Sequence, residues 1–199
     1  MISDEMLVGQ ILQGELSAFE ELVNRYKKPV FAIVYRMIGQ YQEAEDISQE
    51  VFITVYEKLH QFDRTKKFSP WIYRIATNSS ISALRKKKKV VSLSFDENIS
   101  KLEDQLHNPL YFSDPHLMFE QKELKEEIDS AIQELNDNYQ AVIILRYKTD
   151  LNNQEIAEIL NLSKENVEVK VHRARKALRK VILKRMQERG IKNEMPANR

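Results

Sequence analysis

Three polar side chains stand at helical spacing within an acidic stretch of the sequence. Asp46, Gln49 and Glu50 lie at positions i, i+3 and i+4, so they share one face of a helix. Ile47 and Val51 fall on another side, where they can pack inward. The pattern predicts a helix with one buried side and one exposed acidic face, which suits contact with a basic partner surface. An ordinary solvated helix face fits the same spacing.

A second segment combines positive charge with aromatic rings. No acid occurs between Arg64 and Ser94, and Phe68, Trp71 and Tyr73 stand among the basic residues. Positive charge attracts phosphates and aromatic faces stack on unpaired bases, so this combination is typical of single-stranded nucleic-acid binding. Two other interpretations stay open: Trp71 fits a core position, and the lysines at 86–89 fit a solvated helix end favoured by the helix dipole. The basic residues concerned are Lys66, Lys67, Arg74, Arg85, Lys86, Lys87, Lys88 and Lys89.

Residues 152–183 predict a short helix, a tight turn and a second helix. Asn152 to Glu155 form a capped start, and Ser163 caps the second helix, which runs from Lys164 to about Leu183. A helix that is apolar inside and basic outside, placed after such a turn, is the helix-turn-helix pattern, although a helical hairpin with a solvated basic face fits the spacing too. The predicted buried stripe is Val167, Val171, Ala174 and Leu178, and Arg175, Lys176, Arg179 and Lys180 could meet phosphates.

Helical periodicity governs most of the remaining chain. It runs from Leu7 to Tyr41, with Pro29 beginning a new helix that stops at Gly39. A further helix spans about Gln42 to Leu59. Ser69, followed by a proline, is typical of the N-cap of a helix, which we expect to continue to about Lys89. The periodicity fails over 91–119, resumes over about 120–186, and leaves 190–199 as a frayed tail.

The composition agrees with a helical chain. With only four glycines and five prolines in 199 residues, helices run uninterrupted, and no strand signal appears. The absence of cysteine excludes disulfides and zinc-thiolate sites. The N-terminus does not resemble a signal peptide, and no apolar run is long enough to span a bilayer. We therefore expect a soluble cytoplasmic protein without a metal or another cofactor.

Three of these motifs carry a resemblance to a known family. The run from Glu43 to Phe52 resembles region 2.2 of bacterial sigma factors of the sigma-70 family. The run from Phe68 to Asn78, with residues 84–86 after it, resembles regions 2.3 and 2.4, and the helix-turn-helix resembles region 4.2. The short chain resembles the extracytoplasmic-function, or group IV, members. This implies an all-α fold of two small helical domains, region 2 over 1–91 and region 4 over 122–189, joined by a flexible linker over 92–121 and followed by a tail over 190–199.

The resemblance also implies a function. Such a protein binds core RNA polymerase, directs it to particular promoters and helps to open the DNA, and an anti-sigma factor is expected to hold it inactive. The implied polymerase contacts are Asp46, Gln49 and Glu50. The implied contacts to the −10 element are Asp63, Arg64, Thr65, Lys66, Lys67, Trp71, Arg74, Asn78, Arg85 and Lys86. The implied contacts to the −35 element are Lys164, Asn166, Glu168, Lys170, Arg173 and Lys176.

The recognition helix departs from its family at one place. Glu165 to Glu168 stands where the family often carries Gly-Thr-Val-Lys. Two acids at a helix start suit its dipole but repel phosphates. Glu168 could instead accept a hydrogen bond from a cytosine amino group, which would change the usual −35 preference.

Two other classes of protein are weaker interpretations. A stand-alone helix-turn-helix regulator, which would bind duplex DNA by itself, leaves the N-terminal motifs without a role, and a structural adaptor ranks third. The acids around Asp46 could suggest a helical metal-dependent hydrolase, but no second acidic helix is evident to face them. The four histidines lack paired ligand spacing, and no glycine-rich phosphate loop or nucleophile elbow occurs, so we expect no catalytic residue.

Overall fold

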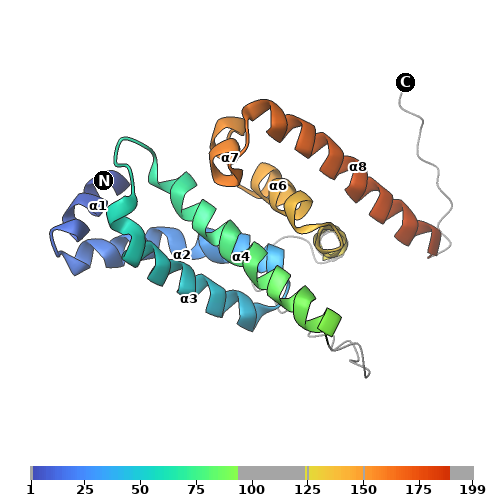
Figure 1. The fold of residues 1–199 in the computed structure, drawn as a ribbon, viewed down its shortest axis with the longest axis horizontal. Helices are drawn as coiled ribbons and strands as arrows, with labels where there is room; N and C mark the ends of the chain where they lie inside the picture. The colour runs from blue at the N-terminus through green and yellow to red at the C-terminus, as the bar shows by residue number, and fades with distance from the viewer. Residues whose placement is uncertain (1, 94–123, 125, 150, 189–199) are drawn as a thin grey trace, which may run out of the picture.

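The computed structural model describes residues 2–93, 124, 126–149 and 151–188, and within these ranges it contains helices and no strand (Figure 1). The predicted all-α fold is confirmed. The predicted linker over 92–121, apart from its first two residues, and the predicted tail over 190–199 lie outside the described residues. Among the described residues, no helix combines the length and apolarity needed to cross a membrane.

The N-terminal unit is a bundle of four helices around one core. Its helices are α1 (Asp4–Leu12), α2 (Leu16–Ile38), α3 (Tyr41–Lys58) and α4 (Phe68–Leu93), with a 3-10 turn over Leu59–Gln61. Apolar side chains from all four helices meet in this core, which follows from their helical spacing. Its fully buried members include Val8, Leu22, Val30, Val34, Val51, Val55, Phe68 and Ile72.

The prediction that Pro29 begins a new helix is wrong, because Pro29 lies inside the continuous helix α2. A proline inside a helix costs roughly 3 kcal/mol through its missing N–H and its clash with the preceding turn. Leu22 and Val30 are nevertheless fully buried on the two sides of Pro29, and each such side chain contributes about 1.5–3 kcal/mol. The continuous buried stripe thus outweighs the interruption. Gly39 does end the helix, with a left-handed φ of 82°.

Two further boundaries differ from the prediction. The helix α4 begins at Phe68, so Ser69 lies within its first turn and is not its N-cap. Phe68 is fully buried in the core, so tertiary packing places the helix start two residues earlier than Pro70, where an N-cap at Ser69 would put it. The same helix continues past Lys89 to Leu93.

The C-terminal unit contains the predicted helix-turn-helix. Residues 126–133 are helical, and α6 (Asp137–Lys148), α7 (Asn153–Leu160) and α8 (Lys164–Glu188) follow. Asn152 and Glu155 form a capping box at the start of α7, and Asn161 ends it with a left-handed φ of 52°. Ser163 Oγ accepts the N–H of Asn166 at 3.3 Å, as expected of an N-cap. The helix α8 extends past the predicted end near Leu183.

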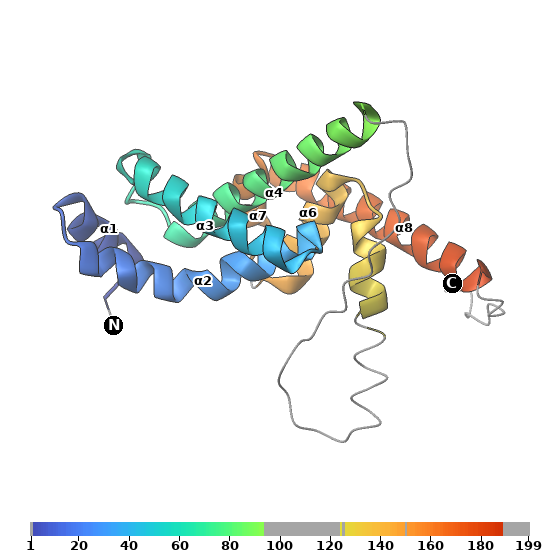
Figure 2. The ribbon, with the colours of Figure 1, turned by 90° about the horizontal axis from the view of Figure 1, so that it is seen from below.

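The two units pack against each other. Helix α6 lies against α2, and α7 lies against α4 (Figures 1 and 2). Ile33 and Met37 of α2 join the core of the C-terminal unit. Buried Gln140 donates through Nε2 to the carbonyl of Met37 at 3.0 Å, so it provides a partner for a carbonyl in the last turn of α2. The result is a shared interior, which the sequence patterns did not predict.

Candidate nucleic-acid interface

The predicted acidic face lies on α3 and is open to solvent. Asp46, Gln49 and Glu50 are all exposed, while Ile47 and Val51 are buried beneath them. Their exposure agrees with the face that the helical spacing predicts, and their contact with polymerase stays a prediction. The structure adds Ile53, which is 59% exposed and one turn further along the same face. A single exposed aliphatic side chain is common on protein surfaces, so Ile53 adds no evidence for a binding site by itself.

The loop before α4 is a tight turn braced by its own side chains. Asp63 Oδ1 accepts the backbone N–H of Thr65 at 3.0 Å and its hydroxyl at 2.7 Å. The two hydrogen bonds from Thr65 lower the pKa of Asp63, so this carboxylate stays ionised and the turn keeps its form. Residues 63–67 are all exposed. The loop thus has a fixed shape and is accessible to a ligand.

Aromatic side chains anchor both ends of this loop. Phe62 and Phe68 are buried, and their ring centroids lie 5.3 Å apart. Trp71 is half-buried and lies 5.3 Å from Phe62 and 5.5 Å from Phe68. These edge and tilted contacts stabilise the cluster beyond its burial. The indole of Trp71 therefore serves the core, as one interpretation of the sequence held, and any contact with a base stays a prediction.

Four predicted −10 contacts follow along α4, and all are exposed: Arg74, Asn78, Arg85 and Lys86. Asn78 and Arg85 line a polar hollow of about 340 Å³, together with Asn138 of α6 and Lys170 of α8. Lys67 also reaches the C-terminal unit, where its ammonium lies 2.8 Å from the carboxylate of Glu155. The hydrogen bond from Lys67 lowers the pKa of Glu155. Asn78 and Arg85, predicted for the −10 element, thus share one hollow with Lys170, predicted for the −35 element, whereas Lys67 and Glu155 line a separate one.

The recognition helix α8 presents five of its six predicted contacts to solvent, and the sixth, Lys170, lines the hollow beside α4. Lys164, Asn166, Glu168, Arg173 and Lys176 are exposed and Lys170 is half-buried. Of the predicted buried stripe, Val167 and Ala174 are fully buried, and the other two are half-buried. The geometry therefore has the sidedness that a major-groove helix needs.

Three residues that act across elements were not predicted from the sequence. Glu5 of α1 contacts the start of α4, Gln140 joins the two units, and Asn153 holds Glu168. None of them is close in sequence to its partner, so local spacing carries no signal for the pairing. Among the described residues, no group of three or more His, Asp or Glu side chains lies close enough to hold a metal ion.

Comparison with known sequences gives two family matches. The family model described as Sigma-70 region 2 matches residues 22–90, and the one described as Sigma-70, region 4 matches residues 125–178. The extracytoplasmic-function (ECF) RNA polymerase sigma factor SigW of Bacillus subtilis is 39% identical over 176 residues, covering 87% of this chain and 93% of that protein. SigM of the same organism is 31% identical, covering 88% of this chain and 98% of that protein.

Solved structures share the fold. CnrH, in complex with the cytosolic domain of CnrY, superposes with a TM-score of 0.63 at 23% identity, covering 90% of this chain and 96% of that one. The sigma factor RpoE of Bartonella quintana, in complex with the anti-sigma factor NepR, has a TM-score of 0.65 at 20% identity and covers 82% of this chain and 96% of that one. At such low identity these structures establish the helical fold.

Proposed function

The chain belongs to the sigma-70 family as an ECF RNA polymerase sigma factor, and from this premise we propose how its surfaces divide the work. The protein binds core RNA polymerase and directs it to particular promoters, where it contributes to melting of the −10 element and recognition of the −35 element. The N-terminal unit carries the polymerase and −10 contacts. The C-terminal unit carries the −35 contacts.

The observation that carries this division is the pairing of α3 and α4 in one bundle. An exposed acidic face on α3 and an exposed basic row on α4 belong to two helices that pack directly against each other. The ammonium of Lys87 on α4 also lies 3.1 Å from the carboxylate of Glu43 on α3. Because the two helices pack together, polymerase bound to α3 and DNA bound to α4 would be held at a fixed distance and orientation. Binding of polymerase would then position it on the promoter.

The acting groups are side chains that bind, so we assign no catalytic residue and no cofactor. The protein works where its polymerase works, in the cytoplasm. We also infer that an anti-sigma factor holds it inactive. Support comes from the structural neighbour RpoE, which was solved with its anti-sigma factor NepR. A stand-alone regulator would instead bind duplex DNA without polymerase. Run-off transcription with core polymerase and genomic promoter fragments distinguishes the two functions.

Charge reversal on α3 tests the polymerase face. We expect the double substitution Asp46→Lys with Glu50→Lys to abolish co-purification with core polymerase, because like charges then face the basic partner surface. Helicity and melting temperature should stay unchanged, since both side chains are exposed. The matched control is Glu15→Lys with Glu20→Lys, a reversal of the same size at exposed positions near the start of α2. Undiminished polymerase binding by the α3 variant would remove the assignment.

A further inference from the structure

We propose that α1 is a positioning element for −10 recognition, in which Glu5 and Gly9 fix the place of the Asp63–Lys67 loop. Helix α1 precedes the stretch matched by the region 2 family model, which begins at residue 22. The inference rests on the proposed contact of this loop with the −10 element, and it takes that contact to be capture of an unpaired base. It adds that the loop is held from outside by a helix that makes no predicted DNA contact.

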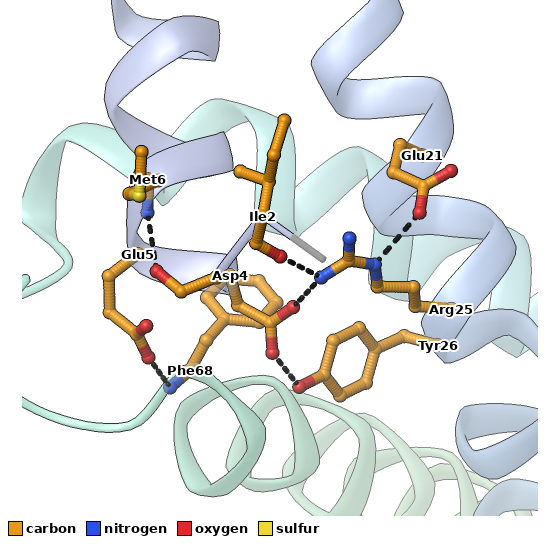
Figure 3. A network of polar contacts seen from close by, with 9 residues as sticks. Ile2, Asp4, Glu5, Met6, Glu21, Arg25, Tyr26 and Phe68 are labelled. Atoms are coloured by element: carbon orange, nitrogen blue, oxygen red, sulfur yellow. Dashed lines mark hydrogen bonds and ion pairs between the residues drawn. The ribbon is translucent and has the colours of Figure 1, made fainter.

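The first contact is between Glu5 and the start of α4. Glu5 Oε1 accepts the backbone N–H of Phe68 at 3.3 Å (Figure 3). Phe68 is the first residue of α4, and N–H groups in the first turn of a helix have no partner inside that helix. A carboxylate at this end also interacts favourably with the helix dipole. Glu5 thus supplies from α1 a cap for α4 and fixes the point where the loop ends.

The second contact is between Gly9 and Arg64 of the loop. A Cβ placed on Gly9 would lie 3.1 Å from Arg64 Nη1, so the guanidinium occupies the space that a side chain would fill. Glycine in the middle of a helix is unfavourable compared with alanine, and Gly9 lies within α1. The close approach of Arg64 gives a structural reason for glycine at this position.

Helix α1 is itself held firmly to α2, so it can serve as a fixed support. Asp4 accepts from Arg25 Nη1 at 2.8 Å and from the hydroxyl of Tyr26 at 2.5 Å (Figure 3). Burial raises the pKa of Tyr26, and the hydrogen bond to Asp4 adds to this effect, so the hydroxyl keeps its proton and remains a donor. Leu7 and Val8 are buried in the core beside these contacts.

Different contacts hold the shape of the Asp63–Lys67 loop and its position in the molecule. The hydrogen bonds from Thr65 to Asp63 hold the shape of the loop, whereas the hydrogen bond from Phe68 to Glu5 and the close passage of Arg64 over Gly9 relate the loop to α1. Capturing an unpaired base needs a pocket that is already in position, because the free energy of unpairing must be offset at once. Removal of the α1 contacts should therefore impair melting without weakening polymerase binding.

The experiment follows −10 melting by holoenzyme on a promoter that carries a fluorescent base analogue in the −10 element. Variants are Glu5→Ala, Glu5→Gln, Gly9→Leu and Arg64→Ala, with Met6→Ala, exposed on the same helix, as the matched control. A separate variant, Asp63→Ala with Thr65→Ala, tests the loop itself. Loss of one hydrogen bond to a carboxylate should reduce the equilibrium for melting about tenfold in Glu5→Ala. Glu5→Gln keeps an acceptor oxygen and should retain most of the activity.

Gly9→Leu favours helix formation, so a melting defect in this variant cannot be ascribed to an unfolded α1. Gly9→Leu should impair −10 melting when Arg64 is present. In the double variant with Arg64→Ala it should cause no further loss, because the guanidinium that leucine would displace is absent. If Glu5→Ala and Gly9→Leu melt the −10 element normally while the loop variant does not, the role of α1 is overturned and the role of the loop stands. Normal melting by the loop variant would overturn the proposed role of the loop, and the role of α1 with it.

Discussion

The carboxylate of Glu168, near the start of α8, accepts a hydrogen bond at 3.1 Å from Nδ2 of Asn153, the first residue of α7. Asn153 Oδ1 in turn accepts from Arg146 Nη1 of α6 at 2.8 Å. One chain of hydrogen bonds therefore joins α6, α7 and α8. A carboxylate has two oxygens and about four lone-pair positions. Glu168 can thus be held by Asn153 and still offer an acceptor to DNA.

This arrangement sharpens the prediction for the recognition helix. If Glu168 accepts from a cytosine amino group, Glu168→Lys should lose about 1–3 kcal/mol at one base position and alter the preference there. Asn153→Ala should weaken the same preference to a smaller degree, because it removes the group that orients the carboxylate. The measurement is a selection from randomised −35 sequences with wild-type and variant holoenzymes.

The opposite role for Glu168 gives a distinct result. A carboxylate that only repels nearby phosphates would make Glu168→Lys bind many sequences more tightly and alike. Identical selected sequences with uniformly tighter binding would show that Glu168 does not read a base. Glu158→Lys, at an exposed position on α7, is the control for a general gain from adding positive charge.

The lysines at the end of α4 should act through phosphates. Substituting Lys86 to Lys89 with Ala should weaken promoter complexes evenly across sequences. It should also flatten the dependence of binding on salt, by about one unit of slope for each DNA phosphate that the variant no longer neutralises. The ammonium of Lys87 lies 3.1 Å from the carboxylate of Glu43. The ammonium of Lys88 lies 2.5 Å from the carboxylate of Asp137. Both lysine side chains remain more than half exposed, so they can exchange these partners for DNA.

Binding measured over a range of salt concentrations checks this prediction. Lys27→Ala with Lys28→Ala removes two exposed lysines from α2, half of the charge that the α4 variant loses, and serves as the control for a change in net charge. An unchanged salt slope in the α4 variant would mean that its lysines form a solvated helix end and no more.

Local patterns predicted most elements because their causes are local. The face of Asp46, Gln49 and Glu50 follows from 3.6 residues per turn. The helix start at Asn152 follows from a side chain that caps neighbouring N–H groups. Such interactions lie within one or two turns of the chain, so spacing alone reveals them.

The predictions are wrong where residues distant in sequence determine where a helix begins or ends. Ser69 carries a strong cap signal, yet Glu5 reaches the start of α4 from 63 residues away. Pro29 signals a helix start, yet buried neighbours on both sides keep α2 continuous. The contact between the two units could not be predicted from local patterns for the same reason. No sequence feature of Gln140 identifies Met37 as its partner.

The packing of the two units supports a final prediction about the free protein. Gln140 is only 2% exposed, and its Nε2 donates to the carbonyl of Met37 across the interface between the units. In Gln140→Leu the Met37 carbonyl loses this donor, at a cost of about 1–3 kcal/mol if it stays buried. Separation of the units would let water reach the carbonyl. We therefore expect the variant to populate an arrangement in which α6 has moved away from α2.

The sequence contains no cysteine, so introduced cysteines can carry spin labels at two chosen sites. His60→Cys and His172→Cys place labels at exposed positions on the two units, and the distance between them reports their separation. Gln140→Leu should broaden and lengthen the distance distribution, while Gln154→Leu, at an exposed position on α7, should leave it unchanged. An unchanged distribution in Gln140→Leu would mean that apolar burial around Ile33 and Met37 holds the units together without this hydrogen bond.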